Sequence, residues 1–275
     1  MFIIYLMTIH TKGAIPMTLN NQHELVLKAI AVLESLESGQ PEAIMNYIHP
    51  EQYVQHNQAL PDGRAAMLGA LDHLKEAGTK VSIKRTLVDG DYVVLHSVYD
   101  FHGPKIGFDI FRFENGFIVE HWDNLQEMAE KTPSHHTMID GPVTITDIDK
   151  TDANKAFVQC FVEDIMIAKN LSLLAAYFDE DHYIQHNPHI ADGLSGLGAA
   201  VRAMEEQRIE MQYTRVHRVI GQGNFVLTVS EGHINGEPNA FYDLFRVENG
   251  KIAEHWDVIE AMLPPEKRKN SNSRF

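Results

Sequence analysis

The chain has 275 residues, of which 44% are hydrophobic and 22% are charged, a balance typical of a folded globular protein. Its formal net charge of −15 argues against nucleic acid and anionic membranes as partners, because both attract cationic surfaces. A single cysteine, Cys160, excludes an internal disulfide and a cysteine-rich metal site, and fits a reducing, cytoplasmic compartment.

The first 20 residues are expected to form an N-terminal extension. They open on MFIIYLMTIH, which is apolar but lacks the basic start of a signal peptide and is too short to span a bilayer. A helix should follow, because apolar residues recur at helical spacing: Leu25, Ala29, Val32, Leu33 and Leu36. A short second helix is predicted at about 41–48.

Two motifs of the first half return in the second. YVQHN at 53–57 returns as YIQHN at 183–187, and in each half a third helix is predicted to follow. DIFRFENGFIVEHWD at 109–123 returns as DLFRVENGKIAEHWD at 243–257, with 11 of the 15 positions identical. The two motifs recur after 130 and 134 residues. A repeat of that length is a whole small domain, so the sequence predicts a tandem duplication.

The second half repeats the order of helices and strands. Its first helix carries an apolar stripe of Phe157, Cys160, Phe161, Ile165 and Ala168. The stripe predicts that Cys160 is buried core rather than a nucleophile, and Asp152 is the expected N-cap. A short helix is predicted at 170–178 and another after Gly193; the predicted strands are 211–220, 224–234, 239–247 and 251–259.

Helices followed by an antiparallel run of strands indicate an α+β domain, with the helices laid across one face of a curved sheet. A curved sheet covered on one side encloses a cone-shaped cavity. We therefore expect two cone domains, each of three helices packed on a curved antiparallel sheet. The expected segments are 21–130 for the first domain, 131–151 for a linker, 152–263 for the second domain and 264–275 for a polar C-terminal tail.

The last strand of each half divides its side chains between two faces. Successive residues of a strand alternate, so His255 and Asp257 point one way while Trp256 points the other. His121 and Asp123 do likewise in the first half, with Trp122 opposed to them. Large rings on the outer face suggest an interface, and the simplest one joins the two halves.

The face of Asp243 depends on the turn at 248–250. A three-residue loop closed by a left-handed Gly250 would pair Asp243 with His255, whereas a two-residue Asn-Gly loop would place it opposite Trp256. We favour the three-residue loop, because it gathers one mostly apolar face with three polar groups. That face would hold Phe241, Asp243, Phe245, Ala253, His255 and Asp257.

Such a face could perform acid and base chemistry. A carboxylate among aromatic rings loses hydration of its charged form, which raises its affinity for a proton, and a neighbouring histidine could orient or share that proton. The alternative interpretation is a buried polar network that only fixes the register of the hairpin.

Four polar residues precede the third helices, and they either contact a ligand at the mouth of the cone or cap and turn the chain. They are His56, Asn57, His186 and Asn187. Tyr53 and Tyr183 are expected in the core with their hydroxyls satisfied, with a pocket role as the alternative.

The 16 histidines of the chain make metal binding a further alternative. His186, Asp243, His255 and Asp257 offer suitable nitrogen and oxygen ligands, but there is no HxH or HExxH spacing, so no metal is expected. The sequence also lacks a GxSxG elbow, a CxxC pair and a phosphate-binding glycine loop.

YxQHN, D-I/L-F-R-x-E-N-G and I-x-E-H-W-D together resemble the SnoaL-like family of polyketide cyclases. That family belongs to the nuclear transport factor 2-like superfamily, which includes ketosteroid isomerase. The resemblance implies a cone with a deep pocket, no cofactor and dimerisation through the sheet. It also implies intramolecular aldol condensation with a general acid or base at Asp123 and Asp257, while Asp109 and Asp243 match the oxyanion-stabilising aspartate of the isomerase.

Together, these features predict a cofactor-independent enzyme that acts on an apolar, carbonyl-containing small molecule. Asp257 and Asp123 would be acid and base. The oxyanion would be held by Asp243, Asp109, His255 and His121, and the ligand would be positioned by His186 and His56. The alternatives are a binding module without chemistry and an assembly scaffold. The halves are expected to pack sheet to sheet as an intrachain pseudo-dimer, with further homo-oligomerisation left open.

Overall fold

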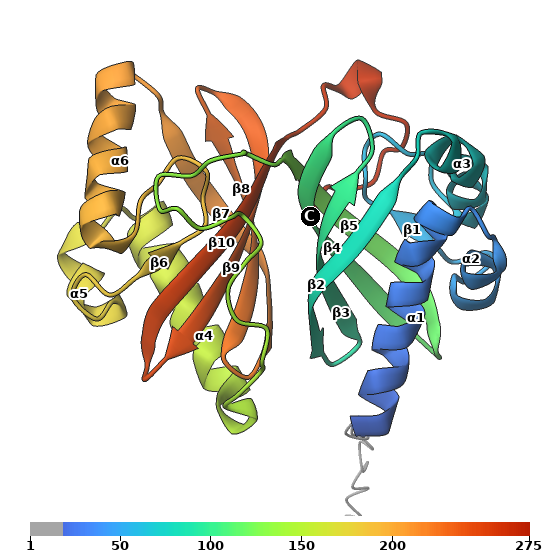
Figure 1. Cartoon of the computed structure of the whole chain (residues 1–275), viewed down its shortest axis with the longest axis horizontal. Coiled ribbons are helices and arrows are strands. Elements are labelled where there is room, and N and C mark those ends of the chain that lie inside the picture. Colours follow the sequence, from blue (N-terminus) through green and yellow to red (C-terminus); the bar gives the residue numbers. More distant parts are fainter. Residues whose placement is uncertain (1–18) are drawn as a thin grey trace, which may run out of the picture.

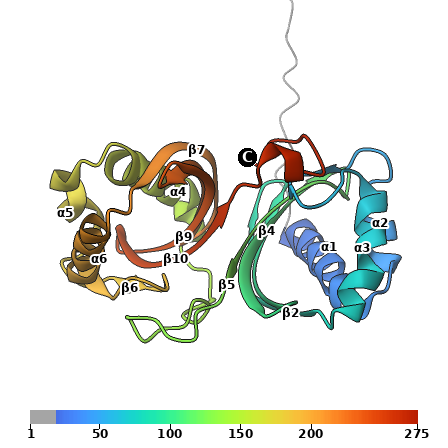
Figure 2. The same ribbon diagram turned by 90° about the horizontal axis from the view of Figure 1, so that it is seen from above.

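The computed structural model describes residues 19–275 and contains two similar halves that lie side by side (Figure 1). Each half has a five-stranded sheet with its helices on one face, and the two sheets lie between the two helical layers (Figures 1 and 2). The expected α+β architecture of two cone domains is confirmed. The predicted N-terminal extension lies outside the described residues, except for its last two.

The first half begins with the helices and ends with an antiparallel meander. Its elements are α1 (Leu19–Ser38), α2 (Glu42–Tyr47), β1 (Val54–Gln55), α3 (Arg64–Glu76), β2 (Lys80–Asp89), β3 (Tyr92–Asp100), β4 (Pro104–Glu114) and β5 (Phe117–Glu127). The strand order is β1-β5-β4-β3-β2, and only β1 runs parallel to its neighbour. Its core lies between α1 and the concave face of the sheet, where Ala29, Val32 and Leu33 are buried as their spacing predicts.

The second half repeats this order. Its elements are α4 (Thr151–Phe161), a π-helical turn (Val162–Ile167), α5 (Leu174–Tyr177), β6 (Ile184–Gln185), α6 (Gly193–Gln207), β7 (Met211–Gln222), β8 (Phe225–Ile234), β9 (Glu237–Glu248) and β10 (Lys251–Ala261). Short 3₁₀ turns occupy Ile148–Lys150, Leu171–Leu173 and Pro265–Lys267. Among residues 19–275, no helix combines the length and apolar character needed to cross a lipid bilayer.

Two local predictions for α4 are wrong. Cys160 is exposed rather than buried, because the stripe that enters the core runs through Val158, Phe161 and Val162. Asp152 is not the N-cap, because the helix already begins at Thr151 and Lys150 occupies the cap position without a side-chain bond.

The β9–β10 turn differs from the loop that we favoured. Asn249 and Gly250 both have positive φ and form a two-residue turn, with Glu248 paired to Lys251. A β-bulge at Ala253 then shifts the register by one residue, so Asp243 lies opposite Asp257. The predicted pairing of Asp243 with His255 is therefore wrong. Asp243, His255 and Asp257 nevertheless share one face, as predicted, because the extra residue of the bulge brings Asp243 onto the same face as the other two.

The first half uses the same device. Glu114 pairs with Phe117 across the Asn-Gly turn, and a register shift follows within β5. As a result, Asp109 lies opposite Asp123 on the concave face, while Trp122 points outward. Both halves therefore owe the position of their aspartates to one extra residue in the last strand.

The convex faces of the two sheets pack against each other around the two tryptophans. Trp122 and Trp256 are 1% and 0% exposed and belong to one apolar cluster built from both halves. Arg218 of the second half lies 4.0 Å from the Trp122 ring centroid, and Arg85 of the first half lies 4.2 Å from that of Trp256. The contact is reciprocal, as in a twofold-symmetric interface.

Each tryptophan is covered on its other side by a histidine of its own half. The His56 ring stacks on Trp122 at 4.4 Å, and the His186 ring stacks on Trp256 at 4.6 Å, between ring centroids. Each indole is thus enclosed between an imidazole and a guanidinium from different halves.

The segment after each last strand crosses to the other half (Figure 2). We call residues 131–147 the first arm and residues 262–275 the second arm. In the first arm, the Thr137 carbonyl bonds His186 Nδ1 at 2.7 Å, and the Asp140 carbonyl accepts from Trp256 Nε1 at 3.0 Å. In the second arm, Asn272 Nδ2 donates to the Gln55 carbonyl at 2.9 Å. Each half is therefore clasped by chain that follows the other half.

We expect Trp122→Ala to lower the free energy of unfolding by about 3–5 kcal/mol, because it empties the centre of the interface between the halves. The matched control is Phe117→Ala, whose side chain is on the same strand but 37% exposed; it should cost less than about 1 kcal/mol. Urea denaturation followed by circular dichroism measures both. Similar losses in the two variants would contradict a structural role for the interface.

Candidate functional site

Each half gathers two aspartates and one histidine on its concave face. They are Asp109, His121 and Asp123 in the first half, and Asp243, His255 and Asp257 in the second. In each group, one donor atom from every residue lies within 4.8 Å of the others, and all six residues are buried. We call these the first and second Asp-His-Asp clusters.

In the second cluster, His255 links two elements. Its Nε2 lies 3.0 Å from Asp243 Oδ1, a diagonal contact across the β9–β10 pair. Its Nδ1 lies 3.0 Å from the side-chain oxygen of Gln185 on β6. Because both ring nitrogens face an acceptor, both donate when the imidazole is protonated. The Tyr213 hydroxyl donates to the same Asp243 oxygen at 3.1 Å.

The two carboxylate oxygens of Asp257 differ in their hydrogen bonds. Asn187 Nδ2 donates to Asp257 Oδ2 at 2.6 Å. Asp257 Oδ1 and Asp243 Oδ2 are buried and have no hydrogen-bond partner among residues 19–275. A buried oxygen without a partner is costly, and this cost places such atoms among the candidates for a proton or a ligand.

Burial and neighbouring charges shift the proton affinities of this cluster. Burial raises the pKa of Asp257, and the charge of Asp243 adds to that effect while His255 opposes it. Burial alone would lower the pKa of His255, but the hydrogen bond to Asp243 and the charges of Asp257 and Asp243 outweigh it and raise that pKa. Asp257 and His255 therefore both bind protons more tightly than their isolated side chains would.

The first cluster has the same plan. His121 Nε2 lies 3.0 Å from Asp109 Oδ1, the Tyr99 hydroxyl donates to Asp109 Oδ2, and Asn57 Nδ2 donates to Asp123 Oδ2 at 2.7 Å. Burial raises the pKa of Asp109, although its bonds from His121 oppose the shift.

The tyrosines that donate to the clusters were missed by the sequence reasoning. Tyr99 lies on β3 opposite Val81, whereas Tyr213 lies on β7 opposite Gly232 of β8. The two hydroxyls thus reach equivalent aspartates from neighbouring strands. When the two halves are superposed strand by strand, the residue equivalent to Tyr99 is Gly232 and not Tyr213. Comparing the two repeats therefore does not identify these tyrosines as a pair.

Gln55 and Gln185 were also missed, although both belong to the repeated YxQHN motif. Gln185 accepts from the backbone of Asn187 at 2.9 Å, and it donates to the Tyr183 hydroxyl at 3.0 Å while facing His255. Gln55 contacts His121 Nδ1 at 3.2 Å in the same place. The side-chain amide therefore ties the short parallel strand to the cluster histidine.

The two histidines of that motif do not lie with the clusters. His56 and His186 stack on the outward tryptophans, and their Nε2 atoms contact Glu120 and Glu254 at 2.9 and 2.8 Å. The expected position at the mouth of the cone is wrong, because alternation along the short strand sends the glutamine inward and the next residue outward.

The aromatic rings expected around a ligand are tightly packed. Phe241 and Phe245 are buried; Phe245 stacks on His255 at 4.7 Å and Phe241 packs on Tyr213 at 4.2 Å, between ring centroids. Tyr53 and Tyr183 are buried, and both hydroxyls accept from the motif glutamines, as expected. The interior of the cone around the clusters is therefore filled largely by side chains.

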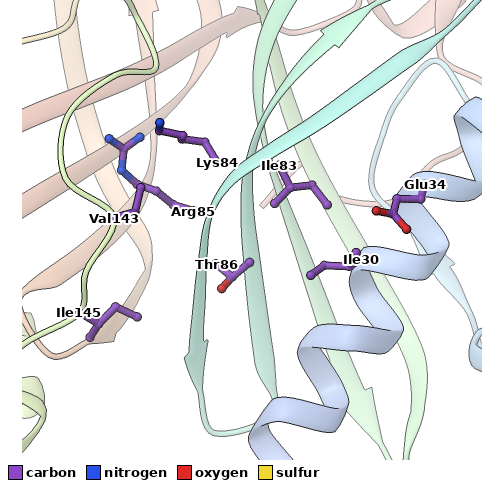
Figure 3. Close-up of a pocket in the computed structure, with 8 residues that line it drawn as sticks. All are labelled: Ile30, Glu34, Ile83, Lys84, Arg85, Thr86, Val143 and Ile145. Atoms are coloured by element: carbon purple, nitrogen blue, oxygen red, sulfur yellow. The ribbon is translucent and has the colours of Figure 1, made fainter.

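Two pockets lie away from the clusters. The larger, of about 540 Å³, is a hollow between α1, β2 and the first arm (Figure 3). Figure 3 shows Ile30 and Glu34 projecting from α1 toward Ile83 of β2, with Val143 and Ile145 on the arm. The smaller, of about 270 Å³, lies beside α1 and the β4–β5 turn.

The clusters also carry the donor atoms that a divalent cation uses, two carboxylates and an imidazole. In each cluster, however, the histidine Nε2 already contacts an aspartate at 3.0 Å, and a metal would have to replace that bond. The arrangement fits shared protons better than a preformed metal site.

A family model described as a SnoaL-like domain matches residues 29–121 and again residues 156–255. No curated protein matches the chain. TsrD from Streptomyces laurentii is 20% identical over 38% of this chain and 90% of its own, with a TM-score of 0.35. IdmH from Streptomyces antibioticus, described as a candidate polyketide cyclase, is 21% identical over 38% and 93%, with a TM-score of 0.33. A protein from Kribbella flavida described as a candidate ketosteroid isomerase is 18% identical over 42% and 84%, with a TM-score of 0.35.

We expect Asp257→Asn to stabilise the fold at pH 8 by on the order of 1 kcal/mol, because it removes a desolvated carboxylate. An acid whose pKa is raised by folding contributes stability that is present below its unfolded pKa of about 3.9 and is lost as the pH rises through the folded value. The gain should therefore shrink as the pH falls toward 4. Urea denaturation between pH 4 and 8 measures it, with the exposed Asp179→Asn as control. Destabilisation at pH 8 would contradict the direction of the shift.

Proposed function

The chain belongs to the SnoaL-like family in both of its halves, and we propose that it is a cofactor-independent enzyme that transfers a proton beside a carbonyl group. The family is matched over residues 29–121 and 156–255. The reaction class would be an aldol-type cyclisation or an isomerisation through an enolate. The substrate would be an apolar small molecule with a carbonyl group.

The observation that carries this proposal is the environment of Asp257. Its Oδ1 is buried and has no hydrogen-bond partner in the described part of the chain, and its other oxygen accepts from Asn187 at 2.6 Å. Burial raises the pKa of this carboxyl. A carboxylate with raised proton affinity is a better base, and its protonated form is available nearer to neutral pH. Asp257 would therefore take the proton from the carbon next to the carbonyl and return it later.

Asp243 would stabilise the charge that forms on the carbonyl oxygen. Its Oδ1 receives bonds from His255 and Tyr213, at 3.0 and 3.1 Å, while its buried Oδ2 has no partner within residues 19–275. When protonated, Asp243 would donate from Oδ2 to the developing oxyanion. Donors that are already oriented in a dry site stabilise such a charge without reorganising during the reaction.

The walls of the second cone suit an apolar substrate. Phe245 stacks on His255, Phe241 packs on Tyr213, and Phe161 packs edge to face on Phe245 at 5.4 Å between ring centroids. A substrate can reach Asp257 only when some of these rings move aside. The same close packing favours the alternative that this fold serves as an assembly scaffold.

The test is hydrogen exchange at carbon. The protein is incubated in D₂O with a panel of apolar ketones and 1,3-dicarbonyl compounds, and loss of the proton signal beside the carbonyl is followed by NMR. We expect the chain to accelerate exchange for at least one compound. Asp257→Asn should reduce that rate by about 10²–10⁴-fold.

The surface variant Asp179→Asn should keep the wild-type rate, since its side chain is exposed on the loop after α5. A thermal shift with a compound that undergoes no exchange would indicate a binding module instead. If no compound exchanges or binds, or if Asp257→Asn exchanges as fast as the wild type, the enzymatic proposal fails.

A further inference from the structure

The two arms place different residues at equivalent points of the two halves. The Thr137 carbonyl of the first arm bonds Nδ1 of His186, and the Ser273 carbonyl of the second arm bonds Nδ1 of His56. The residue that follows is Met138 in the first arm and Arg274 in the second, and both are buried. One half therefore receives a neutral side chain where the other receives a cation.

Arg274 is placed beside the first Asp-His-Asp cluster. It is 5% exposed, and its Nη1 lies 3.7 Å from Asp123 Oδ1, the oxygen to which Asn57 does not donate. Its Nη2 donates to Asn124 Oδ1 at 2.9 Å and pairs with Glu260 of the second half. The guanidinium thus connects the first cluster to the second half.

Met138 makes a different contact at the matching point. Its sulfur accepts from the Ala129 backbone at 3.3 Å, and its side chain joins the apolar cluster between the sheets. Within residues 19–275, no lysine or arginine forms an ion pair with Asp257. The position equivalent to Glu260 is Gln126, since Gln126 accepts from Ile259 N and Glu260 accepts from Leu125 N, both at 2.9 Å.

We propose that Arg274 engages Asp123 as a fixed counter-ion, so that the second half alone performs the proton transfer proposed above, on which this inference rests. A buried guanidinium beside a carboxylate favours the charged carboxylate. A carboxylate that is engaged by a buried guanidinium gives up that attraction when it accepts a proton, so it serves poorly as base or acid. Arg274 is in this sense a positioning residue that acts through Asp123.

The first experiment observes the carboxyl directly. The ¹³C signals of labelled aspartate side chains are followed by NMR between pH 3 and 9 in the wild type and in Arg274→Met/Glu260→Gln. The double variant gives the surroundings of the first cluster the methionine and glutamine found at the equivalent positions, Met138 and Gln126, and leaves no glutamate without its arginine. We expect the midpoint of Asp123 to rise while that of Asp257 stays in place.

The control is Lys267→Met, which removes an exposed cation from the same arm. It should leave the Asp123 midpoint unchanged. A merely structural role for Arg274 would not move one aspartate selectively. An unmoved Asp123 midpoint in the double variant would overturn the proposal.

The second experiment measures exchange in the variants. Asp257→Asn alone should lose at least 90% of the wild-type rate, because the first cluster contributes little. Adding Arg274→Met/Glu260→Gln to it should restore exchange at least fivefold, and a further Asp123→Asn should remove the gain. If Asp257→Asn retains half of the rate, both halves act and the inference is wrong.

The two proposals fail in different ways. If the wild type exchanges no compound, the proposed function fails, while the titration of Asp123 still decides whether Arg274 acts as its counter-ion. If the wild type accelerates exchange but adding Arg274→Met/Glu260→Gln to Asp257→Asn restores no activity, the proposed function stands. The inference that Arg274 silences the first half is then wrong.

Discussion

Each half of this protein depends on the alternation of side chains along its last strand. One face of β10 carries Trp256 to the interface between the halves, and the other carries His255 and Asp257 into the cone. The bulge at Ala253 keeps Asp243 on the inner face, because without the extra residue the two-residue turn would place it opposite Trp256. The packing of the two halves and the geometry of the site therefore both depend on the register of one strand.

The halves keep this plan with different side chains. The hydroxyl that donates to the inner aspartate comes from β3 in one half and from β7 in the other, through Tyr99 and Tyr213. The hydrogen bond is retained although the residue that supplies it has moved to a neighbouring strand. The geometry of the cluster is evidently what both halves share, while the surrounding packing differs.

Much of this could be predicted from the sequence, and the reasons for the rest are physical. Periodicity and the repeated motifs located the helices, the strands and the inward aspartates, because those patterns are local. The predicted three-residue loop was wrong, because a bulge further along β10 decides which residue lies opposite Asp243, and that bulge has no sequence marker of its own. His56 and His186 were misplaced because two residues of strand precede a turn and give too little pattern to assign faces. Arg274 and Met138 lie outside the helices and strands, where no periodic pattern indicates which residues they contact.

The crossing of the arms has a consequence for what a duplicated chain can do. In a homodimer of identical subunits, a substitution in the arm appears twice, and both sites receive the same neighbour. Here one arm brings a methionine to the second half and the other brings an arginine to the first. Joining two copies in one polypeptide thus lifts the constraint of symmetry, and it allows one cone to change its electrostatics while its twin keeps its own.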